Sequence, residues 1–389
     1  MAAWALLPAA GQAHASVVSL VPAAGSVLQY EPNAVRITFN EPVTPFGRGV
    51  DVFAPSGRRV SGTATYRDGQ LVVPIAEYQP LEQGTYRVEW RVVARDTHPS
   101  RGSYAFSLGH PSPVSGGGLQ GGELGAVAPL GLFLQTLARW LHFLGFALAF
   151  GGIAFRVLLL PDPEAPPRLR HLWYAGLALL VIAEPLALAG QAASLGSLDS
   201  LALADLLASA FGRVLALRLG AALLLWGALG AVPEARGRGG WAILGLGAAL
   251  ALVDGLAGHT IRGFPDLAAY LLTAVHVAAM GLWAGGLFSL LAVENRRPLV
   301  ARFGRLAAAS VAVLVLSGAL LALLHLRSPA DLAFTPYGFT LAVKLLAVAA
   351  ALGGAWFGLR ASRTGAPEAV GLGGVLALAA LLASLPPPR

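Results

Sequence analysis

Asp96 and His98 are residues whose types and spacing could bind a metal ion. They stand two positions apart in "RVVARDTHPSRGSYAF", residues 91–106, whose flanks alternate as β-strands do. Side chains two positions apart in an extended chain point to the same side, so a carboxylate and an imidazole would face one ion together. Two ligands are too few for a metal site. The pair therefore indicates either half of such a site or an ordinary surface turn.

A third ligand is available at His14. The stretch "MAAWALLPAAGQA", residues 1–13, resembles the end of a secretory signal peptide, with an apolar run followed by small residues. Cleavage after Ala13 would make His14 the first residue, so that its α-amine and its imidazole Nδ1 could chelate one ion. With the imidazole of His98 this gives three nitrogens, and Asp96 can add an oxygen. Such a nitrogen-rich tetragonal set favours Cu(II).

The composition divides the chain into a soluble part and a membrane part. Of its 389 residues, 56% are hydrophobic and only 12% are charged, whereas soluble proteins carry about 25% charged residues. The chain has no cysteine, which excludes disulfides, thiolate metal sites and cysteine nucleophiles. The formal charge of +7 comes mostly from arginines between apolar segments. This pattern favours loops that set membrane topology over a nucleic-acid-binding surface.

The soluble part predicts an all-β domain over residues 14–109. Short alternating or β-branched runs are separated there by turn sequences such as "PSGRR", "RDGQ" and "EQG". Several short strands at this spacing, without a helical period, predict a β-sandwich. Residues 110–126 are rich in Pro, Gly and Ser and predict a flexible linker. Residues 127–389 predict an all-α membrane domain.

We expect eight transmembrane helices in the membrane domain, since about 20 apolar residues are needed for each crossing. Arginine-rich loops follow the first, third, fifth and seventh of these segments. Positively charged loops stay in the cytoplasm, so the β domain and the C-terminus are expected outside a bacterial inner membrane. The predicted segments are 129–158, 172–192, 211–232, 240–257, 267–293, 304–326, 338–359 and 368–385.

Ionisable residues within the spans are costly to bury and are therefore candidates for function. His142 and His276 lie about 13 and about 10 residues into inward-running spans, close to the membrane centre. Met280 follows His276 by one helical turn. His259 and His325 stand at the outer ends of spans. Together these five residues predict a copper path from the outer surface to the centre, with hydrogen-bonded packing histidines as the alternative.

Three further charged residues lie within the predicted spans. Glu184 and Asp254 are intramembrane acids, and Lys344 is an intramembrane base that could pair with one of them. We expect these charges to support the copper path.

The quoted motifs also carry a family resemblance. "HASVVSLVPAAGSVL", "VRITFNEPV" and "GTYRVEWRVVARDTHPSRGSYAFSLG" resemble the CopC family of periplasmic copper-binding proteins over nearly all of residues 14–109. The resemblance implies a cupredoxin-like or immunoglobulin-like sandwich with Cu(II) bound by His14, Asp96 and His98. It also implies a supporting role for Glu41 beside the N-terminal amine. The domain lacks the methionines that some relatives use for Cu(I), so we expect a site for Cu(II) alone.

The membrane part resembles a second family. "RWLHFLGFALAFGG" and "AGHTIRGFPDLAAYLLTAVHVAAMGLWAGGL" are similar to spans of the CopD family, and the similarity extends over most of residues 130–360. It implies that copper is handled at the inner membrane and across it. A fusion of CopC with CopD predicts a copper importer, with Cu(II) captured outside and Cu(I) or Cu(II) in the membrane domain.

The predicted protein is a transporter and not an enzyme, and no Walker A motif is present to bind ATP. Its expected partners are copper ions, the lipid bilayer and copper chaperones on either side, without nucleic acid. Two alternatives remain open. His142 and His276 could instead ligate a b-type haem in a membrane oxidoreductase. The site at His14 could activate oxygen in a copper oxidase.

Overall fold

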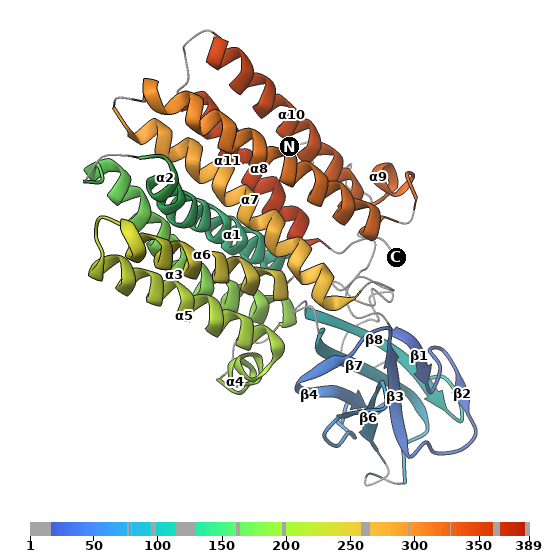
Figure 1. The fold of residues 1–389 in the computed structure, drawn as a ribbon. Helices are drawn as coiled ribbons and strands as arrows, with labels where there is room; N and C mark the ends of the chain where they lie inside the picture. The colour runs from blue at the N-terminus through green and yellow to red at the C-terminus, as the bar shows by residue number, and fades with distance from the viewer. Residues whose placement is uncertain are drawn as a thin grey trace. The chain divides into compact units, whose positions relative to one another are not determined.

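The structure is a computed structural model that describes residues 17–75, 78, 80–94, 99–113, 129–160, 164–196, 200–257, 265–294, 296–326, 328–360 and 366–385. The contacts within the chain divide it into two compact units. One is built around β-strands and also includes residues 189–213 with the short helix Ser200–Ala208, and the other is built around the long helices (Figure 1). Each unit is described by itself.

The strand unit is a β-sandwich of two four-stranded sheets, as the alternating sequence pattern predicts. The strand orders are β1-β3-β6-β5 and β2-β8-β7-β4. Most neighbours are antiparallel, and β2 pairs with β8 in parallel. The bounds are β1 Val17–Val21, β2 Val27–Leu28, β3 Ala34–Phe39, β4 Val43–Phe53, β5 Thr65–Arg67, β6 Gln70–Pro74, β7 Gly84–Ala94 and β8 Pro99–Leu108.

Alternate residues of the long strands fill the core between the two sheets. Phe39 of β3 meets Trp90 of β7 edge to face, with ring centroids 5.2 Å apart, a favourable aromatic geometry. Gly102 of β8 lies directly over the indole, and a Cβ there would come within 2.6 Å of the Trp90 ring. The aromatic pair therefore fixes how the two sheets pack.

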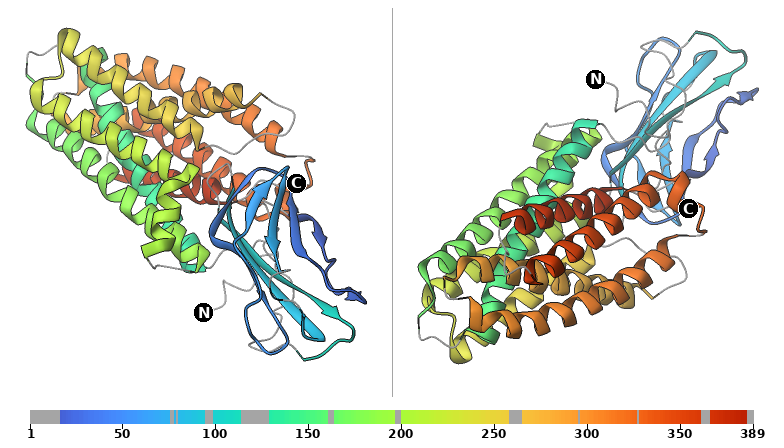
Figure 2. Two further views of the ribbon diagram at one scale, coloured as in Figure 1. Left: turned by 90° about the horizontal axis from the view of Figure 1, so that it is seen from below. Right: turned by 90° about the horizontal axis from the view of Figure 1, so that it is seen from above.

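The helical unit forms a bundle in which the axes of the long helices are roughly aligned with one another (Figure 2). Within the described residues, seven helical segments are long and apolar enough to cross a membrane, counting α1, η2 and α2 as one. The bounds are α1 Pro129–Phe146, the π-helical turn η2 Ala147–Gly151, α2 Gly152–Leu159, α3 Pro167–Leu195, α4 Ser200–Ala208, α5 Ala210–Ala231, α6 Gly237–Leu256, α7 Asp266–Ala292, α8 Arg297–His325, α9 Asp331–Phe334, α10 Pro336–Arg360 and α11 Ala366–Ser384.

The eighth predicted span, 368–385, corresponds to α11. The apolar part of this helix, Val370–Ser384, is shorter than a full crossing, so the prediction of eight spans is not confirmed. The helix nevertheless packs against the start of the bundle. Arg139 and Trp140 of α1 donate hydrogen bonds to the carbonyls of Ala383 and Gly373 in α11, at 2.7 Å and 3.1 Å.

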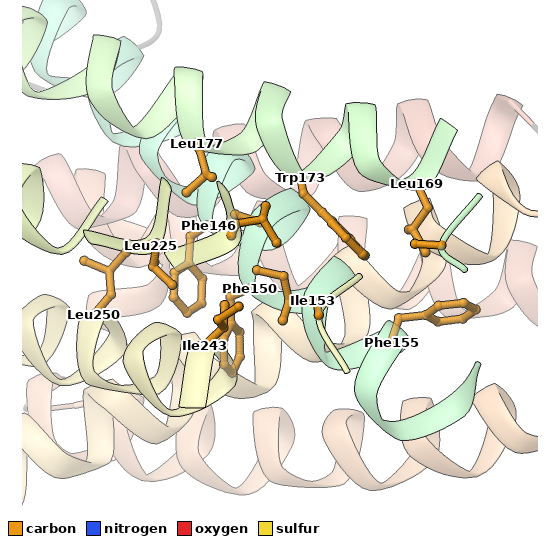
Figure 3. Packing of buried hydrophobic residues seen from close by; sticks show 14 of the residues in the cluster. Phe146, Phe150, Ile153, Phe155, Leu169, Trp173, Leu177, Leu225, Ile243 and Leu250 are labelled. Atoms are coloured by element: carbon orange, nitrogen blue, oxygen red, sulfur yellow. The ribbon is translucent and has the colours of Figure 1, made fainter. Parts of the chain in front are cut away.

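The continuous segment α1–η2–α2 is the central element of the bundle. Of its most apolar window, 72% is buried, against 39% or less for every other candidate span in the described residues. Its large side chains, among them Phe146 and Phe150, interlock with residues of α3, α5 and α6 (Figure 3). The turn η2 lies directly on α7, since a Cβ added to Gly285 would come within 1.8 Å of the Ala147 carbonyl oxygen.

Candidate functional site

The predicted ligands His14, Asp96 and His98 all lie outside the described residues. Glu41, the predicted supporting residue, stands half-buried in the turn between β3 and β4.

The strand register shows where the predicted ligands attach to the sandwich. The start of β1, the β3–β4 turn that holds Glu41, and the end of β7 with the start of β8 lie at one end of it. The pairs that place these connections are Val17 with Phe39, Val43 with Ala94, and Val93 with Pro99. The described strands therefore bring the flanks of all the predicted ligands to the same end.

A second group of polar residues lies inside the helical unit, where His142 of α1 is held between two carboxylates. Its Nδ1 lies 3.0 Å from Oε1 of Glu184 in α3. Its Nε2 lies 2.9 Å from Oδ1 and 3.1 Å from Oδ2 of Asp254 in α6. Arg218 of α5 donates from Nε to Oδ1 of Asp254 at 2.8 Å. We call His142, Glu184, Asp254 and Arg218 the charge cluster.

The charge cluster is largely shielded from solvent, most completely at His142, Glu184 and Asp254. The side chains of His142, Glu184 and Asp254 are at most 4% exposed, and that of Arg218 is 17% exposed. Ion pairs in such surroundings persist only when each charge has partners, because an unpaired buried charge is strongly destabilising. Four helices supply one member each, so the cluster ties α1, α3, α5 and α6 together.

The side chains of the charge cluster do not point toward one common position where a metal ion could bind. The two ring nitrogens of His142 point in opposite directions, so the carboxylates bonded to them lie on opposite sides of the imidazole. Within the described part of the chain, no three histidine, aspartate or glutamate side chains are grouped to hold a metal. Copper could bind His142 only after one of these bonds breaks, so we leave this residue out of the copper path proposed below.

His276 of α7 differs from His142, because its hydrogen bond in the described structure is through one ring nitrogen, Nδ1. Its Nδ1 lies 2.9 Å from Oγ of Ser317 in α8, and that hydroxyl donates its hydrogen to the Val313 carbonyl at 2.6 Å. Because the hydrogen of Ser317 is already used, Oγ must accept from Nδ1–H of His276. The lone pair of the ring then lies on Nε2, to which no described residue hydrogen-bonds. This is the tautomer of a histidine that binds a metal ion through Nε2.

The neighbours of His276 include a soft ligand and a base. Met280 stands one turn along α7, as predicted, and is partly buried. Lys344 of α10 is half-buried and lies within electrostatic range of His276. The expectation that Lys344 pairs with Glu184 or Asp254 is wrong, because the ion pairs of both acids in the described structure are with His142 and Arg218.

The two histidines predicted at the outer ends of spans have different outcomes. His259 lies outside the described residues. His325 ends α8, and its Nδ1 donates to the Leu321 carbonyl at 2.7 Å, which puts the ring lone pair on Nε2. Its ring lies 6.1 Å from that of Tyr337. His325 therefore has the same tautomer as His276.

Three family models match successive parts of the chain. The CopC domain matches residues 17–109, the copper resistance protein D-like N-terminal domain matches 130–263, and copper resistance protein D matches 297–383. The chain belongs to the CopC–CopD fusion family. Copper transport protein CutJ of Bacillus subtilis is 29% identical over 98% of this chain and 76% of its own length. Copper resistance protein C of Pseudomonas syringae is 37% identical over 28% of this chain and 90% of its own length.

Solved structures are similar to the N-terminal domain. CopC from Methylosinus trichosporium is 24% identical, with a TM-score of 0.23, over 26% of this chain and 97% of its own. PcoC from Escherichia coli is 29% identical, with a TM-score of 0.21, over 25% of this chain and 99% of its own. Together with the seven apolar helices, the family matches make this CopC–CopD fusion a multi-pass membrane protein.

The geometry of the CopD part does not favour the alternative of a bis-histidine haem. Haem iron held by two histidines needs two imidazoles that face each other. Both nitrogens of His142 are engaged by carboxylates of α3 and α6, whereas His276 faces Ser317 of α8.

Two buried arginines of the CopD part were not among the predicted residues. Arg218 completes the charge cluster. Arg156 is 1% exposed and donates to the carbonyls of Glu234 and Leu160, at 3.0 Å each, which ties α2 to the α5–α6 connection. Both lie inside predicted spans, where the cost of burying a charge is itself a signal.

Proposed function

We propose that this CopC–CopD fusion captures Cu(II) outside the cytoplasmic membrane and passes copper into or across that membrane as an importer. The observation that carries the proposal is a histidine inside the CopD part, His276, whose hydrogen bond fixes the tautomer used for metal binding. The names of the relatives, a copper transport protein and copper resistance proteins, support copper as the ion.

The capture site would comprise the amine and Nδ1 of His14, the imidazole of His98 and an oxygen of Asp96. Glu41 would bind the N-terminal amine or orient it. The strand register supports this site, because the described flanks of these residues meet at one end of the sandwich. The three nitrogens suit Cu(II), and signal-peptide cleavage after Ala13 would create the free amine.

The membrane path would begin at His259 and His325 and continue to His276 and Met280. Imidazole and thioether ligands together suit Cu(I) better than Cu(II). The nearby Lys344 acts in the same direction, because its positive charge repels a divalent ion twice as strongly as a monovalent one. This proposal assigns transport without catalysis. It places the CopC part and the C-terminus outside, as the arginine-rich loops predict.

The experiment that tests this function compares copper accumulation by cells that express the full chain or one variant. We expect His276→Ala to abolish copper-dependent uptake while Cu(II) still binds to the CopC part. His171→Ala is the matched control, because His171 is an exposed histidine at the start of α3. Uptake by His276→Ala equal to that of the wild type would remove His276 from the path, and no uptake by the wild type would reject import.

The capture site is tested by adding one residue before His14 in the exported protein. The extra residue removes the free amine from the ligand set while leaving the side chains of His14, Asp96 and His98 in place. We expect the Cu(II) affinity to fall by orders of magnitude in a competition titration. An unchanged affinity would show that the amine is not a ligand.

A further inference from the structure

The charge cluster in the CopD part has no role in the copper path proposed above, yet it contains three titratable side chains in a row. Glu184, His142 and Asp254 form one continuous hydrogen-bonded chain, which Arg218 completes at the Asp254 end. Intramembrane chains of acids and histidines are the usual components of proton relays. Imidazole suits the middle position, because it accepts a proton on one nitrogen and releases one from the other.

A charge count shows that the cluster holds one exchangeable proton. Glu184 and Asp254 carry two negative charges when ionised, and Arg218 carries one positive charge. A buried group of charges is most stable when its sum is zero, so one further proton must reside on His142 or on a carboxyl group. Since His142 is hydrogen-bonded on both sides, this proton has a path to either end of the chain.

The surroundings of the cluster supply an independent observation. The π-helical turn η2 begins at Ala147, just over one turn after His142, and such turns occur frequently at functional sites. Pro185 directly follows Glu184 inside α3, where its missing N–H leaves one helical hydrogen bond unmade. Two of the four helices thus depart from regular α-helical hydrogen bonding beside the charged residues.

The cluster joins a residue near the end of one helix to a residue well within another. Asp254 lies in the last turn of α6, which ends at Leu256. Glu184 lies 11 residues before the end of α3, which is about 16 Å along the helix. Asp254 is therefore the member of the cluster nearest a helix end, and it lies across a single imidazole from Glu184.

We propose that the charge cluster is a proton-transfer site that couples proton movement to copper movement through the CopD part. In the transfer step, the O–H bond of protonated Glu184 breaks as Nδ1–H of His142 forms. The Nε2–H bond then breaks as Asp254 takes up that proton. One proton moves and nothing is oxidised. The opposite direction reverses these bonds, and rotation of the imidazole ring resets the tautomer of His142 before the next proton moves.

The described contacts show which groups act on His142 and how α7 could respond. Glu184 from α3, Asp254 from α6 and, through Asp254, Arg218 from α5 are its charged neighbours. The helix α7 presents glycines to η2, and its own histidine faces α8. Gly255, next to Asp254, touches the backbone of α7, since a Cβ there would lie 2.4 Å from the Tyr270 carbonyl oxygen. A change at Asp254 therefore reaches the helix that carries the proposed copper ligands.

This inference rests on copper transport by the chain, so the experiment measures copper and protons together. The full chain is reconstituted in vesicles that enclose a pH-sensitive dye, and copper is added outside as Cu(I) or Cu(II). We expect copper entry with a change of internal pH that corresponds to about one proton per ion, by the charge count above. Copper entry without a pH change would overturn the coupling alone, whereas no copper entry would overturn the proposed function as well.

Glu184→Gln is the decisive variant, because the amide keeps the shape and a hydrogen bond but cannot carry the proton. We expect proton movement to fall at least tenfold, and the copper rate to lose its dependence on pH, while bound copper per protein stays unchanged. Glu294→Gln is the matched control, since Glu294 is exposed and paired with Arg168 at 3.6 Å. An unchanged ratio of protons to copper in Glu184→Gln would reject the proposal, and so would a loss of bound copper per protein, which would indicate a purely structural role.

A second variant keeps the test decisive if Glu184→Gln does not fold. Asp254→Asn with Arg218→Leu removes one negative and one positive charge, so that the ionised Glu184 and protonated His142 remain balanced. Asparagine cannot accept the proton from Nε2, so we again expect copper movement without proton movement. Proton movement at the wild-type ratio in this variant would overturn the assignment.

Discussion

Replacing Arg218 by leucine tests whether the charge cluster is held by balanced charges. Its Nε donates to Asp254 at 2.8 Å, and the Asp254 side chain is 2% exposed. Removing one partner of a buried ion pair costs about 3–5 kcal/mol, because the other charge stays buried and uncompensated. We expect the lower end of this range, about 3 kcal/mol, because Arg218 is itself 17% exposed and the cluster can take up a second proton.

The assay is thermal unfolding of the full chain in detergent, followed by the fluorescence of its eight tryptophans. At about 2–4 °C per kcal/mol for a unit of this size, Arg218→Leu should lower the unfolding temperature of the helical part by about 6–12 °C. Lowering the pH should reduce this loss, because a second bound proton neutralises the cluster. Arg213→Leu is the matched control in the same helix. Arg213 is exposed, and its replacement should change the temperature by less than about 2 °C.

Adding Asp254→Asn to Arg218→Leu should recover at least half of the loss, because the double variant buries one ionised acid with one protonated histidine. Equal losses for Arg218→Leu and Arg213→Leu would refute the charge-balance reasoning. So would a double variant that is less stable than Arg218→Leu alone, since the two substitutions would then act independently.

Two further predictions concern single contacts in the CopD part. Ser317→Ala removes the acceptor that holds Nδ1–H of His276, so copper affinity at this histidine should fall about 10–100-fold in a competition titration; unchanged affinity would contradict the proposed ligand geometry. Gly285→Ala would place a Cβ 1.8 Å from the Ala147 carbonyl oxygen, so it should lower the unfolding temperature clearly, whereas Gly220→Ala, with open space around it, should not; equal effects would contradict the close contact between η2 and α7.

The spans were predictable because length and apolarity dominate the signal. The predicted segments 129–158 and 267–293 correspond to helical segments Pro129–Leu159 and Asp266–Ala292. The short helix α4, Ser200–Ala208, was not predicted, because a helix of nine residues gives no span-length signal. The strands were predictable from their alternation, which the buried inner face of β7 confirms.

The neighbours of the buried histidines were not predictable in the same way. Distance along a helix gave His142 and His276 similar depths, but the direction of a side chain depends on how each helix is rotated. The residues of α7 are apolar on every face of the helix, so its sequence does not indicate which face packs against which neighbouring helix. The pairing of His142 with Glu184 and Asp254 needs the arrangement of three helices, which only the folded bundle provides.

The different roles proposed for His142 and His276 follow from their surroundings, one of which favours a bound proton and the other a bound copper ion. His142 lies between two carboxylates, and Arg218 lies beside one of them. This environment stabilises a proton on the imidazole, because the charges of the protonated histidine and the arginine together balance the two acids. A neutral histidine with its Nδ1–H held by Ser317, and a thioether one turn away, offers a soft lone pair to copper. The two environments lie on different sides of α7, which contacts α6 beside Asp254 and α8 at Ser317. A single helix thus touches α6 beside the proposed proton site and also carries His276 and Met280, so a shift of α7 is the simplest movement that could couple proton and copper movement.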